Sequence, residues 1–371
     1  MPYINDKMAA IEAERSDREA LGAENTLSND NVEGLVLRLD GSRFAIDIEA
    51  VERHLAEEIV GQDEACAIVR GILEIVAADL ADPRKPLATV LFMGPTGVGK
   101  TEIVRALTRV LHGDADMLNR VDMNTLSQEH YAASLTGAPP GYVGSKEGST
   151  VFDQELLEGR HGKPAIVLFD ELEKASPEVI LALLNIFDNG IMTVASGGRT
   201  YTFRKAIIFM TSNLGTASAI SEERSSPFER VKRLFAGRLT KNRSQGPEDE
   251  LLQRFPPEFV NRIDRIHTFS RLDEDVQERL IEAHMGRLNK RLKRRGLELT
   301  LDESVFEHLR AEGFDKRFGA RALARQIRAK IELPLARHLL SGNASQLPNG
   351  GMCRLFAEFE DGSVRFVALS G

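Results

Sequence analysis

The sequence predicts an α/β protein: a parallel sheet flanked by helices, followed by a smaller and mainly helical domain. Short apolar segments alternate with helical segments along the first 270 residues. Buried strands that alternate with helices form parallel sheets covered on both faces. The pattern then changes to a series of helices and two closing strands, which indicates a second domain.

Length and composition agree with this prediction. The chain has 371 residues, of which 42% are hydrophobic and 28% charged, and these values are typical of a globular protein. A net charge of −8 argues against nucleic acid as the main partner. The two cysteines are far apart in the sequence, which fits a reducing compartment, and no segment has the length and apolarity to cross a membrane. We therefore expect a cytosolic protein with no membrane partner.

The segment before the first buried strand contains an arm, a hairpin signal and two helices. Residues 1–34 are polar and acidic, which is typical of an arm or linker. Residues 35–46 surround an Asp-Gly pair and predict a β-hairpin. Asp47 is a suitable N-cap for a helix over 48–58. A second helix is predicted over 63–81, because Asp82 precedes a proline.

Five strands are predicted for the large sheet. Apolar runs place them at 88–93, 118–121, 164–169, 206–211 and 263–269. Helices are predicted from residue 101 and at 127–133, 149–157, 177–188 and 227–236, and residues 192–202 contain a Gly-Gly turn between strand-like halves. Ligand-binding groups are expected where these strands end, because parallel sheets bind ligands at the carboxyl ends of their strands.

The last hundred residues predict the second domain. Helices are expected at 274–295, 302–312 and 319–341, and a terminal β-hairpin is expected from strands at 352–359 and 363–369 around an Asp-Gly turn. We therefore divide the chain into an N-terminal arm, a large domain that includes the 35–46 hairpin, and a small domain, at 1–34, 35–271 and 272–371.

A phosphate-binding motif follows the first strand. Residues 94–101 match G-x-x-x-x-G-K-[ST] and read Gly94-Pro95-Thr96-Gly97-Val98-Gly99-Lys100-Thr101. The glycines allow successive backbone N–H groups to point at an anion, and the helix that follows directs its positive dipole end at the phosphates. Lys100 would reach the β- and γ-phosphates, and the Thr101 hydroxyl would bind Mg²⁺. The sequence therefore predicts a nucleoside triphosphate site.

Two acidic residues end the most apolar strand of the chain. Asp170 suits a Mg²⁺ ligand, directly or through water, and Glu171 could act as general base toward an attacking water. The alternative is that Asp170 caps the next helix and Glu171 is a surface charge. Asn213 follows another buried strand and could hold the same water, or it could cap a turn.

Two arginines could complete such a site. Arg262 lies just before a predicted strand, and a cation supplied across a subunit interface stabilises the transition state of phosphoryl transfer. Arg321 begins a predicted helix of the second domain and could reach the γ-phosphate. The alternative for each is a surface ion pair, which contributes little to stability.

Six motifs in the same order resemble the second ATPase module of Clp/ClpB-type AAA+ proteins. They are the phosphate loop, Gly-Ala-Pro-Pro-Gly-Tyr-Val-Gly at 137–144, Leu-Phe-Asp-Glu-Leu-Glu-Lys-Ala at 168–175, Met-Thr-Ser-Asn-Leu-Gly at 210–215, Asn-Arg-Ile-Asp at 261–264 and Gly-Ala-Arg at 319–321. The resemblance covers about residues 48–371. Val60-Gly61-Gln62 resembles that family's adenine-contacting segment, of which Val60 and Gly61 are the expected contacts.

The resemblance implies a P-loop AAA+ large domain, a small AAA+ lid domain and a role for each matching residue. ATP and Mg²⁺ would be the cofactors, bound through the phosphate loop, Asp170 and Arg321. Glu171 would activate water, Asn213 and Arg321 would be the first and second sensors, and Arg262 would be the arginine finger. Tyr142 and Val143 would contact substrate on a loop that lines the pore of a ring, expected to be a hexamer. The alternative for Tyr142 is a side chain folded back onto its own domain.

The sequence also departs from the resemblance. It contains one ATPase module, whereas full-length ClpB-type proteins carry two. We find no Ile-Gly-Phe or Ile-Gly-Leu peptidase-docking loop between Asn213 and Arg262, and no inserted coiled coil. The resemblance implies an ATP-hydrolysing unfoldase or remodelling motor acting on protein substrates. Two alternatives remain: a nucleotide-gated remodeller or assembly scaffold dedicated to one protein partner, and a nucleic-acid loader, which the acidic charge disfavours.

Overall fold

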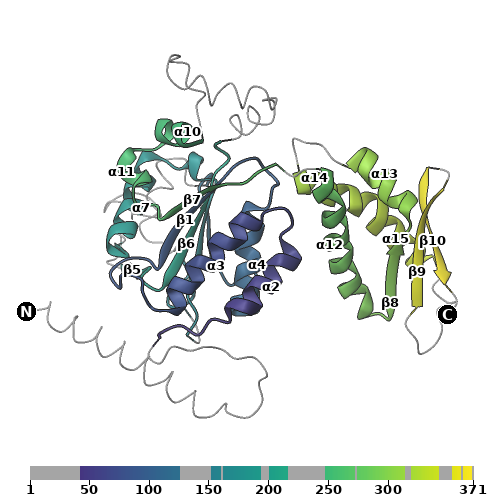
Figure 1. Ribbon diagram of the computed structural model, residues 1–371, viewed down its shortest axis with the longest axis horizontal. Helices are drawn as coiled ribbons and strands as arrows, with labels where there is room; N and C mark the ends of the chain where they lie inside the picture. The colour runs from purple at the N-terminus through teal and green to yellow at the C-terminus, as the bar shows by residue number, and fades with distance from the viewer. Residues whose placement is uncertain are drawn as a thin grey trace, which may run out of the picture.

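A computed structural model gives the arrangement of the elements. It describes residues 42–125, 152–159, 162–193, 200–215, 247–271, 274–313, 319–341, 353–360 and 362–369. A large α/β unit contains the central sheet, and a smaller unit beside it contains the last helices and strands (Figure 1). The predicted fold class is confirmed.

The central sheet has five parallel strands. They are β1 (Ala88–Met93), β2 (Asn119–Asp122), β3 (Ala165–Asp170), β6 (Ala206–Thr211) and β7 (Arg265–Thr268), in the spatial order β2-β3-β6-β1-β7. Strands β1, β3 and β6 are buried at every residue, because helices cover both faces of the sheet. Since the strands run in one direction, their carboxyl ends share one edge, and residues that follow β1, β3 and β6 meet there.

One face of the sheet is covered by three helices. They are α2 (Ile48–Glu58), α3 (Asp63–Ala77) and α4 (Lys100–His112), which lie together in front of the strands in Figure 1. The Asp47 side chain caps α2, as predicted, by accepting a hydrogen bond of 2.8 Å from the Ala50 backbone N–H. Apolar side chains of these helices and of β1 and β6 form one hydrophobic cluster. Helix α4 is thereby held with its first residue at the end of β1.

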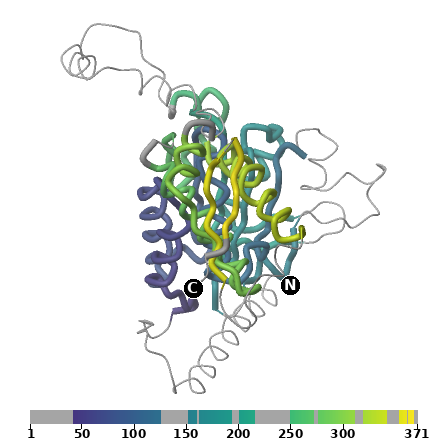
Figure 2. The backbone as a smooth tube through the Cα atoms, turned by 90° about the vertical axis from the view of Figure 1, so that its right-hand side faces the viewer, coloured from purple at the N-terminus to yellow at the C-terminus, as the bar shows by residue number. Residues whose placement is uncertain are grey.

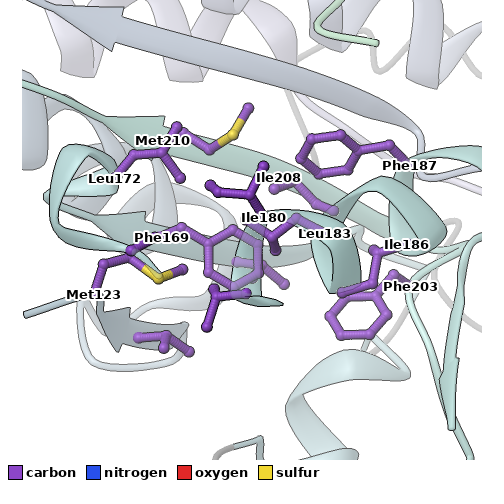
Figure 3. Close-up of a cluster of buried hydrophobic side chains, with 14 of the residues drawn as sticks. Met123, Phe169, Leu172, Ile180, Leu183, Ile186, Phe187, Phe203, Ile208 and Met210 are labelled. Carbon is purple, nitrogen blue, oxygen red and sulfur yellow. The ribbon is translucent and has the colours of Figure 1, made fainter. Parts of the chain in front are cut away.

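The opposite face packs on a second cluster. Helix α7 (Pro177–Asn189), the short α6 (Gln154–Leu157) and the hairpin of β4 (Ile191–Thr193) and β5 (Thr200–Thr202) surround it. Figure 3 shows the side chains of α7 directed at those of β3 and β6. Two further helices, α10 (Pro247–Arg254) and α11 (Pro257–Val260), follow on this side and were not predicted from the sequence.

Several predicted elements differ from the structure. Residues 42–46, the described part of the 35–46 hairpin, do not form a strand; the Ala45 N–H bonds the Gly162 carbonyl, and Phe44 and Ile46 are buried in the helical cluster. Helix α3 ends four residues before the predicted end, because Asp79 adopts a φ of +54°. Helix α6 is shorter than predicted, and the predicted helices at 127–133 and 227–236 lie outside the described residues.

The small unit contains its own hydrophobic cluster. Its elements are α12 (Glu274–Lys293), β8 (Leu297–Leu301), α13 (Glu303–Gly313), α14 (Gly319–Ile327), a π-helical segment (Arg328–Glu332), α15 (Leu333–Leu340), β9 (Cys353–Glu360) and β10 (Ser363–Leu369). The predicted pair β9 and β10 (yellow in Figure 2) is antiparallel, as in a hairpin, and β8, which was not predicted, pairs with β9 in parallel. The single helix predicted over 319–341 contains the π-helical segment just before Pro334, whose missing N–H cannot continue an α-helical ladder.

Candidate active site

The phosphate loop connects β1 to α4 at the carboxyl edge of the sheet. Gly94 and Gly99 have φ values of +122° and +109°, which side chains with a Cβ rarely adopt. A Cβ on Gly94 would lie 2.7 Å from the Phe269 carbonyl oxygen. The sequence motif therefore folds as a loop whose backbone conformation requires glycine, and α4 begins at Lys100 with its N-terminus at the loop.

The Lys100 ammonium is enclosed in this loop. Its Nζ donates hydrogen bonds of 2.6 Å to the carbonyl oxygens of Gly94 and Pro95, and of 3.2 Å to Oδ1 of Asn213. The pKa of Lys100 is lowered from 10.5 to about 8, mainly by burial; Glu173, Asp170 and Glu171 favour the charged form, and the nearby Arg321 disfavours it. Lys100 thus makes hydrogen bonds to carbonyl oxygens at the position where phosphate oxygens are expected.

Asp170 ends β3, and its side chain contacts three hydrogen-bond donors. Its Oδ1 accepts from the hydroxyls of Thr211 and, at 3.3 Å, of Thr101, and its Oδ2 forms a 2.6 Å ion pair with Arg120 of β2. Thr211 and Arg120 were not identified from the sequence. Thr211 ends β6, so the carboxyl-edge rule could have indicated it if the strand order had been known, whereas Arg120 is the second residue of β2 and reaches Asp170 from within that strand.

The donor set beside the loop fits Mg²⁺. The Thr101 hydroxyl and the Asp170 carboxylate supply hard oxygen atoms at hydrogen-bond distance from one another. Among the residues that the structure describes, no group of three or more His, Cys, Asp or Glu side chains could hold a metal. Mg²⁺ bound here would therefore need oxygen atoms from nucleotide phosphates and water, which is how this ion usually binds.

Glu171 follows Asp170 in an uncommon backbone conformation. Its φ is +58°, in the left-handed region, and its N–H donates a 3.2 Å hydrogen bond to the Thr211 hydroxyl. Strained residues of this kind cluster at functional sites. The half-buried Glu171 side chain is thus held beside Asp170 by its main chain, which was the predicted position of the general base.

Asn213 lies two residues beyond β6 and contacts both Lys100 and Glu173. Its Nδ2 donates a 2.9 Å hydrogen bond to Glu173 Oε1, and its backbone N–H donates to Glu173 Oε2 at 3.3 Å. Glu173 was quoted only as part of a motif at the sequence level. From the sequence, functions were assigned only to its neighbours Asp170 and Glu171, because no local pattern indicates a separate role for Glu173.

The predicted adenine-contacting segment lies between the phosphate loop and the small unit. The amide Nε2 of the buried Gln62 donates hydrogen bonds to the carbonyl oxygens of Val98, at 3.4 Å, and Ser270, at 3.1 Å. A Cβ on Gly61 would lie 2.8 Å from Val276 in α12. Val60 is buried. This segment thus contacts both the phosphate loop, through Val98, and the small unit, through Val276.

Helix α14 begins against the phosphate loop. The Ala320 N–H donates a 3.0 Å hydrogen bond to the Gly97 carbonyl oxygen, and Gly319 has a φ of +52° and no room for a Cβ beside Gly97. Arg321 is therefore in the first turn of a helix that contacts the loop. Its charge acts on Lys100, and the small unit contributes this cation to the same site.

Arg262 lies at the opposite edge of the sheet. Its carbonyl oxygen accepts a 3.0 Å hydrogen bond from the Thr89 hydroxyl at the start of β1, whereas the phosphate loop follows the end of β1. The rise of a parallel strand separates Thr89 from Gly94 by about 16 Å. The Arg262 side chain is 48% exposed and forms a 2.9 Å ion pair with Asp188. Arg262 thus lies away from the phosphate loop and the other predicted site residues of its own chain.

Tyr142 and Val143, the predicted substrate contacts, lie outside the described residues. The same is true of residues 216–246, which include most of the segment searched for a peptidase-docking loop. Within the described parts of the chain, no helix is long and apolar enough to cross a membrane.

A parallel sheet, a glycine-dependent phosphate loop and a helical unit that brings a second cation to the loop define a P-loop ATPase of the AAA+ class. Residues 85–266 match the family model described as "AAA domain (Cdc48 subfamily)". Residues 272–350 match "C-terminal, D2-small domain, of ClpB protein". The chain belongs to the ClpB-type AAA+ ATPases, with a D2-type ATPase module and a D2-small domain. It binds and hydrolyses ATP as a member of this family.

Individual relatives fall into two groups. The chain is 47% identical to the ATP-dependent protease ATP-binding subunit-like protein AmiB of Pseudomonas aeruginosa, over 99% of this chain and 100% of the relative. It is 37% identical to the chaperone protein ClpB of Aquifex aeolicus, over 85% of this chain and 30% of ClpB. The chain thus spans about a third of that ClpB.

A solved structure has the same fold over most of the chain. This is Hsp104 in a closed state with ATPγS and FITC casein, determined by cryo-EM. Its TM-score is 0.68 at 28% identity, covering 86% of this chain and 51% of Hsp104.

Proposed function

We propose that this protein is a ring-forming AAA+ motor that uses ATP hydrolysis to unfold or remodel protein substrates, which pass through an axial pore lined by Tyr142 and Val143. The position of Arg262 is the observation that carries the proposal. The Arg262 main chain bonds Thr89, about 16 Å along the sheet from the phosphate loop, and its guanidinium pairs with Asp188 and not with a residue of that loop. Arg262 suits the site of a neighbouring copy, so each active site needs two subunits, as in a ring that we expect to be a hexamer.

Within one subunit the proposed roles follow from the contacts. On ATP binding, Lys100 exchanges the carbonyl oxygens of Gly94 and Pro95 for phosphate oxygens. Thr101 and Asp170 hold Mg²⁺, which when bound neutralises phosphate charge. Glu171 accepts a proton from the attacking water, and Asn213 orients that water. Arg321 brings the small domain toward the γ-phosphate, so that loss of this phosphate releases the domain.

Protein is the substrate class that the relatives support. Hsp104 was solved together with casein, and ClpB is named a chaperone. The AmiB-like relative is named as a subunit-like protein of an ATP-dependent protease. We propose the cytosol as the location, since the chain has only two cysteines and both are free thiols. Nucleic acid remains an unfavoured partner because of the charge of −8.

A mixing experiment tests the shared active site. Arg262→Ala leaves a subunit's own phosphate loop intact, and Glu171→Gln leaves its Arg262 intact. Each variant alone should hydrolyse ATP very slowly. A mixture should regain ATPase activity, because a Glu171→Gln subunit supplies Arg262 to a neighbouring Arg262→Ala subunit. Lack of recovery in mixtures that co-elute as oligomers on a sizing column would contradict the proposal.

The pore assignment has a separate test. Tyr142→Ala should keep basal ATPase activity but lose the unfolding of a fluorescent model protein, with Tyr142→Phe as the matched control that keeps the aromatic ring. Unfolding at the wild-type rate by Tyr142→Ala would remove Tyr142 from the substrate path.

A second candidate function is a nucleotide-gated remodeller or scaffold for one protein partner. The match along the whole length of the AmiB-like relative favours it, because the chain covers that relative in full but only about a third of the chaperone ClpB. ATPase stimulation by many unfolded proteins would support the general motor, and stimulation by one partner alone would support the dedicated remodeller.

A further inference from the structure

Glu173 contacts Asn213 of the active site although the proposed chemistry does not use Glu173. It lies in a short 3-10 turn (Leu172–Lys174) just after Asp170 and Glu171, and its side chain is half-buried. Both of its carboxylate oxygens accept hydrogen bonds from Asn213, one from the side-chain Nδ2 at 2.9 Å and one from the backbone N–H at 3.3 Å. A bidentate contact of this kind fixes both the position and the rotation of the amide.

The chemistry of the neighbours determines which way the Asn213 amide faces. A carboxylate only accepts hydrogen bonds and an ammonium only donates them. The Asn213 Nδ2 must therefore face Glu173, and its Oδ1 must face Lys100, which donates to it at 3.2 Å. Asn213 thus directs an acceptor, its carbonyl oxygen, into the site.

The main chain of Glu173 is itself held in place. Arg254, the last residue of α10, donates to the Glu173 carbonyl oxygen from Nε at 3.0 Å and from Nη2 at 2.6 Å, and to the Ala175 carbonyl oxygen at 3.2 Å. At the other side of Asn213, the Gly215 N–H donates a 2.6 Å hydrogen bond to Glu250 of the same helix. Helix α10 therefore holds both the turn that carries Glu173 and the segment that carries Asn213, so the spacing of the two residues is set in advance.

We propose that Glu173 is a positioning residue for ATP hydrolysis, which holds the Asn213 side-chain oxygen toward the active site so that it accepts a hydrogen bond from the attacking water. This inference rests on the proposed role of Asn213. Without Glu173 the amide can rotate and present its NH₂ group to the site, where it would compete for a phosphate oxygen and leave the water without its acceptor. Glu173 thus acts through Asn213 and needs no contact with the nucleotide.

The test combines Glu173→Gln with Asn213→Ala in a double-mutant cycle on kcat. Glu173→Gln preserves size but adds a donor, so it should lower kcat about 10- to 100-fold, as loss of an outer-shell partner commonly does. Asn213→Ala should lower kcat by about 100-fold or more, as loss of a group that contacts the reacting atoms does. The double variant should be no slower than Asn213→Ala, because a residue that acts through Asn213 has no effect once Asn213 is gone.

ADP affinity separates positioning from a general structural role. ADP lacks the γ-phosphate and has no attacking water, so its Kd should stay within about threefold in Glu173→Gln, and the melting temperature should hardly change. Glu178→Gln, at an exposed position on the following helix, is the matched control and should keep the wild-type kcat.

Three results would overturn the inference. They are a Glu173→Gln variant with wild-type kcat, a double variant in which the two losses multiply, and a parallel loss of ADP affinity and melting temperature with kcat. Ordinary turnover in Asn213→Ala alone would instead remove the proposed role of Asn213, which distinguishes failure of the proposed function from failure of this inference.

Discussion

The two edges of the central sheet differ in how they hold their charged residues. At the carboxyl edge, Lys100 is 7% exposed and Asp170 also 7%, and each makes hydrogen bonds to several groups. At the amino edge, the Arg262 side chain is 48% exposed and forms an ion pair with the partly exposed Asp188. Each edge carries a cation that could bind a phosphate. Lys100 is buried among hydrogen-bonding partners of its own chain, whereas Arg262 is exposed at the surface.

The difference indicates that the two edges have different functions. Buried ions need fixed partners, so the carboxyl edge can bind nucleotide within one subunit. An exposed arginine at a surface can leave its partner at little cost, so it is free to act on another molecule. Variants at the two edges should therefore separate nucleotide binding from hydrolysis.

The largest effect is expected from Arg262→Ala. It should lower kcat about 10³- to 10⁵-fold, the range found for arginine fingers in other enzymes, because the transition-state charge loses its cation. ADP affinity should stay unchanged, as measured by titration with a fluorescent ADP analogue. The control is Arg265→Ala, an exposed arginine at the same edge. Equal losses in both variants would mean that general surface charge, and not Arg262, is responsible.

Lys100→Ala should differ from Arg262→Ala, because it should weaken nucleotide binding itself. Loss of a charge-assisted contact worth about 1.5–3 kcal/mol should weaken ADP binding roughly tenfold to 150-fold. Lys174→Ala, an exposed lysine close in sequence to the acidic pair, is the control and should bind ADP normally. Unchanged ADP affinity in Lys100→Ala would contradict the assignment of residues 94–101 to phosphate binding.

The pH dependence of ADP binding should reveal Lys100 directly. The free protein has a Lys100 pKa of about 8, and bound phosphates would raise it. Binding therefore takes up a proton above this pH, and metal-free ADP affinity should be flat below pH 8 and then fall about tenfold per pH unit. Lys100→Arg keeps its charge and should abolish the dependence. Calorimetric titrations from pH 7 to 10 measure it, and equal slopes in the two proteins would exclude Lys100 as the source.

The smallest effect is expected from Asp188→Asn. Removing an exposed ion pair should change the free energy of unfolding by less than about 1 kcal/mol. The kcat should remain close to that of the wild type, because the ion pair must break before Arg262 can reach a neighbouring phosphate. A large decrease in kcat would show instead that Asp188 orients Arg262. The cation at the amino edge would then be held in place by its own chain, as Lys100 is at the carboxyl edge.

Local pattern was sufficient for most of the sheet. Strands β1 and β6 have the predicted bounds, because each is an apolar run enclosed by polar or turn-forming residues. Strand β8 was missed, because its five residues lie between two helices and pair with β9 more than fifty residues later in the chain. Its residues do alternate between leucine and a polar side chain, which is typical of a half-buried strand, but the partner strand could not be identified from nearby sequence.

The candidate site was predictable where the residues of one short motif determine the backbone conformation of that motif. The conformation of Gly94 and the start of α4 at Lys100 follow from residues 94–101 themselves. The contacts of Arg120 with Asp170 and of Glu173 with Asn213 did not follow, because each joins residues that lie in, or just after, different strands. Their prediction would have required the order β2-β3-β6-β1-β7 in advance.

The sequence by itself determined the phosphate loop, the acidic pair at the end of a buried strand and the change from sheet to helices after residue 271. These features depend on backbone conformation and apolar periodicity, which act over a few residues. Only the tertiary structure decided that Arg321 lies at the loop of its own chain and Arg262 does not. The physical reason is the geometry of the sheet: all strands run one way, so residues on either side of β1 are separated by its whole length.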